Sequence, residues 1–273
     1  MEEQKKPVEP SAELQQLVAD ADTGGREASG AVAKLIFVVA VGWSLFQLWY
    51  ASPLPFTLGW GILNDTEARS LHLGIALFLG FLCYPAFKRW GRSGVPWYDW
   101  VLAVVAAFAG AYFLLFYAEL ATRPGKPNLQ DVVIACTGLV LLLEATRRAV
   151  GTPMTVLAIV FLVYILFGQH MPEVLSHKGA SLERMLSHQW LTTEGVYGVA
   201  LGVSSSFIFI YVLFGALLDR AGAGNYMMQV SMALLGHMRG GPAKVAVVSS
   251  GLNGLISGSS VSNVVSGGIF TIP

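Results

Sequence analysis

The sequence predicts an all-α integral membrane protein in which about six transmembrane helices precede a re-entrant helical hairpin. Of the 273 residues, 54% are hydrophobic and only 12% are charged, whereas a soluble globular chain carries about 25% charged residues. Long charge-free runs recur along the chain, and the last of them is rich in glycine and serine. The balance of 17 Lys and Arg against 17 Asp and Glu leaves no basic excess for binding nucleic acid.

The predicted spans are charge-free runs on the scale of the roughly 20 residues that a helix needs to cross the hydrocarbon core, and the fourth run is the weakest. The runs cover residues 35–64, 71–87, 100–118, 132–143, 150–172 and 195–218. Pro53 and Pro55 end the first helix near Ala51. The fourth helix continues to about Val150, because Arg147 and Arg148 can extend to the interface and pair with Glu144.

Loop charge predicts the orientation of these spans. Residues 1–30 form a polar tail without the apolar core of a signal peptide. With this tail in the cytoplasm, 12 Lys and Arg fall in the inner segments and 5 in the outer loops. The positive-inside rule therefore predicts a cytoplasmic N-terminus.

The loop over residues 171–194 is longer than the other predicted outer loops. Leu182, Met185, Leu186 and Trp190 recur at the spacing of one helix face. One interpretation is an amphipathic helix in the outer interface, with Trp190 at headgroup level. The other is a docking shelf for an extracytoplasmic partner.

Residues 245–273 are free of charge but poorly suited to an uninterrupted span. They contain five glycines, seven serines and two asparagines, and broken backbone is tolerated in a membrane only where it lines a polar cavity. Two half-helices meeting at a polar tip, Ser257 to Ser260, would form a re-entrant hairpin. Carbonyls and hydroxyls at such a tip coordinate Na⁺ in broken-helix transporters. Close helix packing through Gly254 and Gly258 is the alternative.

An intramembrane serine hydrolase using Ser259 or Ser260 is the weakest interpretation. Such an enzyme needs an activating base within hydrogen-bond reach, and the five histidines fall at predicted span ends or in loops. We therefore expect a protein that is not an enzyme.

Several motifs, in order, resemble the permease of tripartite ATP-independent periplasmic (TRAP) transporters. The large-subunit motifs are Gly240-Gly-Pro-Ala-Lys244, Ile256-Ser-Gly-Ser-Ser-Val261 and Ile269-Phe-Thr-Ile-Pro273. Those typical of the fused permease branch, which works with TAXI-type binding proteins, are Leu71-His-Leu-Gly74, Leu143-Glu-Ala-Thr-Arg-Arg148, Leu191-Thr-Thr-Glu-Gly195, Phe207-Ile-Phe-Ile210 and Phe214-Gly-Ala216.

The resemblance implies a domain organisation. Residues 31–150 correspond to the four-helix small subunit and residues 151–241 to the opening helices of the large subunit, which include the outer amphipathic loop. Residues 242–273 correspond to the first re-entrant hairpin of the transport domain.

It also implies an elevator-type secondary transporter in which the Na⁺ gradient, without ATP, imports a small organic anion such as a carboxylate or amino acid. A periplasmic binding protein of the TAXI type would deliver the substrate to a permease in the inner membrane of a bacterium or archaeon. The implied substrate and ion site comprises Ser257, Gly258, Ser259, Ser260 and Asn263, with Ser257 and Ser260 as the Na⁺ ligands.

The large subunit of the family continues beyond a first hairpin, so we expect this chain to be the front part of a longer permease and to act with the remainder of that chain in lipid. A natural truncation, or a structural membrane protein that does not transport, are the alternatives.

Overall fold

The computed structural model describes residues 25–26, 28–87, 94–123 and 125–254. These residues are helical throughout the regular parts of the chain, with no strand among them. The described chain divides by packing into two units, residues 25–210 and residues 211–254, and each is taken by itself. The all-α class is therefore confirmed.

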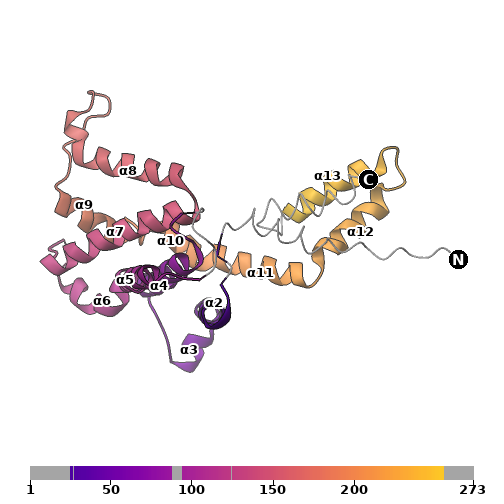
Figure 1. Ribbon diagram of the computed structural model, residues 1–273, viewed down its shortest axis with the longest axis horizontal. Helices are drawn as coiled ribbons and strands as arrows, with labels where there is room; N and C mark the ends of the chain where they lie inside the picture. Colours follow the sequence, from indigo (N-terminus) through magenta and orange to yellow (C-terminus); the bar gives the residue numbers. More distant parts are fainter. Residues whose placement is uncertain (1–24, 27, 88–93, 124, 255–273) are drawn as a thin grey trace. The chain divides into compact units, whose positions relative to one another are not determined.

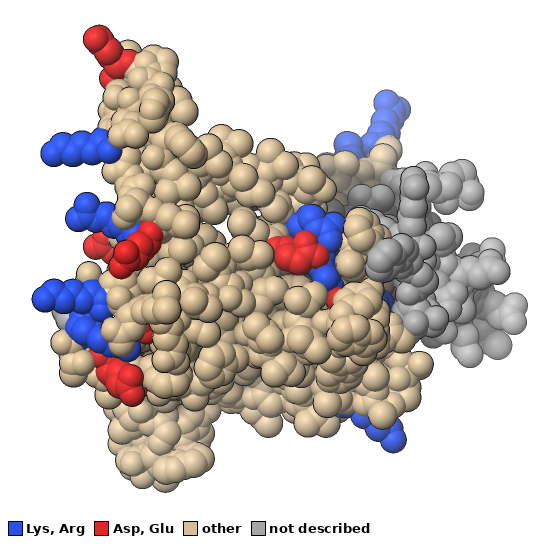
Figure 2. Space-filling view, turned by 60° about the vertical axis from the view of Figure 1, so that its left-hand side comes forward, with Lys and Arg blue, Asp and Glu red and all other residues tan. Residues whose placement is uncertain are grey.

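Six helical stretches are long and apolar enough to cross a membrane, as predicted. They are α2 (Gly30–Ala51), α4 (Asp65–Cys83), α5 and α6 together (Trp97–Thr122), α7 (Leu129–Ala149), α8 with η1 (Thr152–His170), and the stretch Val199–Leu218. On the face shown in Figure 2, charged side chains gather in separate groups with uncharged surface between them. That pattern suits helices whose middle parts face lipid.

The core of the first unit is formed by α4, α5 and α7, which pack against one another (Figure 1). The closest approach is between α4 and α5, where a Cβ on Gly110 would lie 2.9 Å from the Cα of Gly74. Small residues at both positions allow the two backbones to touch, as they do in membrane helix pairs. The buried face of α5 is accordingly made of Ala103, Ala106 and Ala109.

By contrast, α2 and α8 keep most of their surface outside this core. Phe37, Val38 and Leu45 on α2 are well exposed, and so are Val160 and Phe161 on α8. Thr155 is the single fully buried residue of α8. Apolar exposure around nearly the whole circumference is typical of a helix surrounded by lipid.

The predicted starts of the second and the sixth span were wrong. The second helix begins at Asp65, six residues before the charge-free run, because Asn64 and Glu67 form a capping box. His72 therefore lies inside α4 rather than at its end. The sixth helix begins at Val199 as α10 (Val199–Val203), passes through a π-helical turn η2 (Ser204–Ile208) and continues as α11 (Phe209–Arg220).

The predicted amphipathic helix is present as α9 (Leu182–Trp190), but its interfacial interpretation is wrong. Met185, Leu186 and Trp190 are buried in the protein core, and only Leu182 of the predicted face is exposed. The apolar face of a short helix can pack equally well against protein or against lipid, so its periodicity alone could not distinguish the two environments.

The second unit contains α12 (Ala223–Leu235) and α13 (Gly241–Gly254), which pack against each other. A Cβ added to Gly224 would lie 3.5 Å from Oδ1 of Asn253, so the two helices meet at this pair. The described part of the predicted hairpin is thus one helix, and its tip and second half lie outside the described residues.

Candidate functional site

Backbone carbonyls at the joint between α5 and α6 accept hydrogen bonds from side chains of several other elements. The helix changes direction at Ala111 (φ −84°, ψ 5°), and carbonyls near such a break need partners from elsewhere. The Ala109 carbonyl accepts from Trp190 Nε1 at 3.2 Å, and the Gly110 carbonyl accepts from Tyr197 at 2.8 Å and from Ser70 at 2.8 Å.

This set of hydrogen bonds fixes α9 and the turn that follows it. Trp190 and Tyr197 are fully buried and meet edge to face at 5.7 Å between ring centroids. Burial raises the pKa of Tyr197, so its hydroxyl stays protonated and donates to Gly110. The anchored helix is therefore a fixed part of the protein, available to form one wall of a site.

The opposite wall begins at the N-terminus of α7. Asp131 is fully buried, accepts from Tyr112 at 2.6 Å and caps the helix through the amide of Asn128 at 2.8 Å. Arg123 pairs with Asp131 at 2.9 Å and lies 3.8 Å from Glu119. The short loop after α6 is thereby tied to the start of α7.

A groove lies between this loop and α9. One hollow of about 320 Å³ is lined by Tyr117, Arg123, Asp131 and Thr193 among others, and a second of about 470 Å³ by Ser181, Glu183, Arg184 and His188. The two share Gly125, Pro127, Ser187 and Thr192. We call this feature the α9 groove. Hydroxyls and charges of both signs line it beside apolar side chains such as Leu120 and Leu191, a mixture typical of surfaces that bind other proteins.

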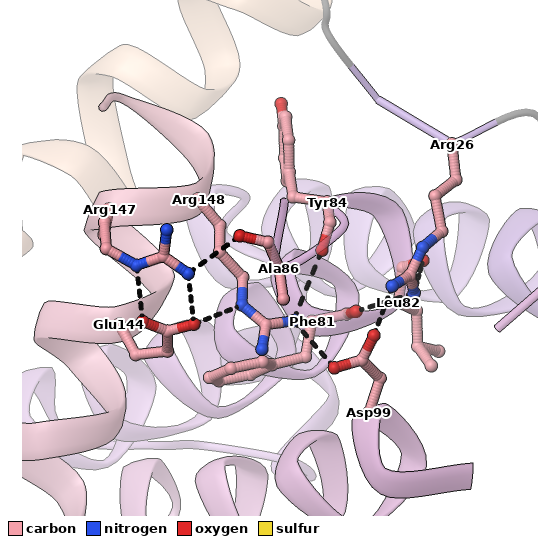
Figure 3. A network of polar contacts seen from close by, with 9 residues as sticks. All are labelled: Arg26, Phe81, Leu82, Tyr84, Ala86, Asp99, Glu144, Arg147 and Arg148. Atoms are coloured by element: carbon pink, nitrogen blue, oxygen red, sulfur yellow. Dashed lines mark hydrogen bonds and ion pairs between the residues drawn. The ribbon is translucent and has the colours of Figure 1, made fainter. Parts of the chain in front are cut away.

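A second polar feature is a network of ion pairs that is buried around Asp99 and half-buried at Glu144 and Arg147 (Figure 3). We call it the Asp99 cluster: Arg26, Asp99, Glu144, Arg147 and Arg148. Asp99 is fully buried and pairs through one oxygen with Arg26 and through the other with Arg148 at 2.8 Å. Glu144 pairs with Arg147 and Arg148 at 2.7 Å each. The predicted pairing at the end of the fourth span is confirmed.

The same arginines donate to carbonyls at the C-terminal end of α4 and, at Ala86, just beyond it. Arg147 donates to Ala86 at 2.9 Å, Arg148 to Tyr84 at 3.4 Å and Arg26 to Leu82 at 3.3 Å (Figure 3). Cations are favoured there because the last carbonyls of a helix carry partial negative charge. The carboxylates are fully paired, so the cluster joins α4, α5, α7 and the segment before α2 rather than presenting a binding site.

A third polar feature is buried within the span formed by α4. His72 Nδ1 lies 3.2 Å from Trp43 Nε1 and 2.5 Å from Gln47 Nε2, both on α2, and its Nε2 lies 3.4 Å from Ser204 of the π-helical turn. The Gln47 side chain is buried and its Oε1 has no hydrogen-bond partner. These contacts attach α2 to α4 and η2.

The structure does not test the predicted substrate and ion site. Ser257, Gly258, Ser259, Ser260 and Asn263 lie outside the described residues. Asn253, which flanks the predicted tip, is a nearly fully buried residue of α13. Within the described ranges, no group of three or more His, Cys, Asp or Glu side chains could hold a metal ion.

Sequence reasoning found the pairing of Glu144 with the two arginines but missed its connection to Asp99 and Arg26. It also missed the role of His72. Asp99 and Arg26 lie 73 residues apart, and charge at the end of an apolar run is usually solvated. The signal for His72 was the start of its helix. Because α4 begins early enough to be capped, His72 lies one turn beyond the charged first turn and inside the helix, where a buried position could have been expected.

Six apolar spans, buried polar joints within them and a polar groove at one end define a polytopic α-helical membrane protein. Residues 137–273, half of the chain, match the family model for the DctM component of the tripartite ATP-independent periplasmic transporter, so the chain belongs to this family. The chain is therefore a TRAP transporter permease, of a family of transporters rather than enzymes, which implies a transported substrate and a periplasmic binding protein as partner. Neither a curated protein nor a solved structure matched it.

Proposed function

We propose that this chain is part of a Na⁺-coupled permease that imports a small organic anion by an elevator movement, with a TAXI-type binding protein as its partner. The observation that carries the proposal is the family match over residues 137–273, which includes every predicted site residue. The cytoplasmic N-terminus is also part of the proposal and rests on the distribution of basic residues.

Sodium coupling is supported by the composition of the 257–263 segment. Hydroxyls and free backbone carbonyls are the hard oxygen donors that Na⁺ prefers at broken helices. In the proposal, Ser257 and Ser260 ligate Na⁺, while Gly258, Ser259 and Asn263 contribute backbone and amide groups beside the substrate.

Uptake by the complete permease in proteoliposomes tests this assignment. With binding protein and substrate outside, uptake should require an inward Na⁺ gradient and should not need ATP. Ser260→Leu should abolish uptake while inserting normally, and Ser44→Leu on α2 serves as the matched control because Ser44 bonds only its own helix at Ala40. Uptake that is unchanged without the gradient refutes sodium coupling, and normal uptake by Ser260→Leu refutes the site.

The α9 groove is the part of the proposal that concerns the partner. With the N-terminus inside, successive spans cross the membrane in alternating directions. Both the loop that follows α6 and the helix α9 then lie on the outer side, where a periplasmic protein would dock. The groove offers Arg184 and His188 on exposed positions of one helix face, next to Ser187 and Thr192. Interfaces that form and dissociate use such polar, partly charged surfaces.

Docking can be measured separately from transport. Arg184→Glu in the complete permease should weaken binding of the partner in nanodiscs by about tenfold or more, because it reverses an exposed charge on the proposed docking surface and so disturbs charge complementarity with the partner. Lys34→Glu, a change of the same charge at an exposed residue outside the groove lining and the loop before α9, is the control. Equal binding by Arg184→Glu and the parent would exclude the groove as the docking surface.

A further inference from the structure

The loop that leads from α8 to α9 is folded back onto the end of α8. Ala180 donates its amide to Ile165 at 3.0 Å, His177 donates its amide to Gly168 at 3.2 Å, and Tyr164 donates its hydroxyl to Leu175 at 2.7 Å. Carbonyls of the last turn of α8 and of η1 (Gly168–His170) are satisfied in this way. We call residues 171–180 the α8 clasp.

The imidazole of His177 lies at the centre of the clasp. A Cβ added to Gly168 would lie 1.9 Å from His177 Nε2, so the ring occupies the space that a side chain at position 168 would need. The Tyr164 ring meets it edge to face at 4.7 Å between centroids. The ring is therefore held in one position by contacts on two sides.

Both ring nitrogens have partners that define the tautomer. The amide of Gly179 donates to Nδ1 at 3.0 Å, and a backbone amide can only donate. Nε2 lies 3.1 Å from the carbonyl of Tyr164, which can only accept. The clasp therefore requires a neutral imidazole with its hydrogen on Nε2 and its lone pair on Nδ1.

A second proton has no place in this arrangement. A hydrogen on Nδ1 would point at the hydrogen of the Gly179 amide, and both groups would be donors. α8 presents Tyr164 to the ring and η1 presents Gly168, while His170 of η1 packs on Phe167 instead. The clasp itself carries Glu173 and Lys178, both exposed, and no ion pair to His177 occurs among the described residues.

We propose that His177 is a proton-operated latch: protonation of its imidazole releases residues 171–180 from the end of α8. The closed clasp binds no proton at this site, so lowering the pH favours the open form and raising it favours the closed form. Imidazole is the side chain suited to such a change between about pH 5 and pH 8.

The latch also affects the α9 groove. Ala180, held by Ile165 in the closed clasp, immediately precedes Ser181, which caps α9 and lines the groove. Opening removes the last fixed point before that helix. A pH-dependent affinity for the periplasmic partner would follow, and this consequence alone rests on the proposed function.

Hydrogen exchange with mass spectrometry on the complete permease in nanodiscs tests the latch directly. After correction for the intrinsic exchange rate at each pH, peptides covering residues 171–181 should lose protection about fivefold or more between pH 8 and pH 5, the effect of losing a hydrogen bond. His170→Asn should behave as the parent, because His170 lies outside the latch.

Two variants that cannot be protonated complete the test. In His177→Asn the side-chain oxygen can still accept from the amide of Gly179, two residues on, and in His177→Gln the amide nitrogen can still donate toward Tyr164. Both should show protection of residues 171–181 that does not change with pH. Equal protection of the parent at pH 8 and pH 5, or a pH response that persists in both variants, overturns the latch.

The partner's affinity is then compared at the same two pH values. Loss of protection with unchanged affinity retains the latch and refutes its link to docking. Loss of affinity in the parent but not in His177→Asn supports both.

Discussion

At Gly138 the absence of one methyl group decides whether α9 can pack on α7. A Cβ at this position would lie 2.2 Å from the ring of Trp190, which is fully buried and donates to Ala109. The indole fills the space that the glycine leaves, and no rotation of so large a buried ring is available without moving α9.

Gly138→Ala should therefore destabilise the protein by about 1–3 kcal/mol, the usual cost of overpacking a core. The free energy of unfolding in detergent measures this effect. Gly42→Ala on α2 is the matched control, since a Cβ there meets nothing within 4 Å, and alanine should be neutral or slightly stabilising in a helix. Equal stability of the two variants would show that Trp190 is not seated against Gly138.

A second prediction at this scale concerns Asp99. Asp99→Asn leaves the buried guanidinium groups of Arg26 and Arg148 without their shared carboxylate, and breaking a buried ion pair costs about 3–5 kcal/mol. Asp65→Asn is the control because the Asp65 carboxylate is largely exposed where it pairs with Arg69, and such pairs contribute about 1 kcal/mol at most. Thermal unfolding of both variants in one detergent compares them, and similar transition temperatures would contradict the structural role of the cluster.

At the scale of elements, α2 exposes most of its apolar surface and is attached to the rest of its unit by polar contacts. Arg26 holds the segment before it, and His72 holds its middle through Trp43 and Gln47. Ring contacts from Trp43 to His72 and Phe209 extend the second attachment. Since apolar residues on α2 can be solvated by lipid, these polar contacts contribute much of its specific positioning.

His72→Leu should cost about 1–3 kcal/mol, because it leaves the buried Gln47 amide without a partner. The double variant His72→Leu with Gln47→Leu should be more stable than His72→Leu alone, since removing both polar partners removes the unpaired group. A double-mutant cycle on the free energy of unfolding measures this coupling. Additive effects would show that the two side chains do not interact.

The existence of the helices could be predicted from the sequence, because run length and hydropathy are local properties. Their starts could not be predicted as well: α4 begins in the charged stretch that follows Asn64, where a capping box outweighs hydropathy. Whether the apolar face of α9 meets lipid or protein depended on Gly138 and the α5–α6 joint, which lie at least 40 residues earlier in the chain.

The site was less predictable than the fold for the same reason. The Asp99 cluster and the α9 groove assemble from side chains far apart in the sequence, and no short motif predicts either of them as a whole. The predicted ion site at Ser257 to Asn263 rests on a contiguous motif and remains a prediction, since those residues lie outside the described ranges.

At the scale of the whole molecule, the distribution of basic residues predicts which side of the membrane each loop faces. The inner segments carry 12 Lys and Arg and the outer loops 5 when the N-terminus is cytoplasmic. The excess of basic residues on the inner side favours a single orientation for the whole chain. That orientation decides whether the α9 groove faces a periplasmic partner.

Labelling with a membrane-impermeant maleimide tests the orientation in spheroplasts. After Cys83→Ala and Cys136→Ala remove the two native thiols, Lys126→Cys and Arg220→Cys each add one at an exposed position. We expect Lys126→Cys to react in intact spheroplasts because it lies in the loop beside the groove, and Arg220→Cys to react only after permeabilisation because it lies in an inner segment. Labelling of both after permeabilisation controls for access. The reverse pattern would place the groove in the cytoplasm, and a periplasmic protein could then not dock there.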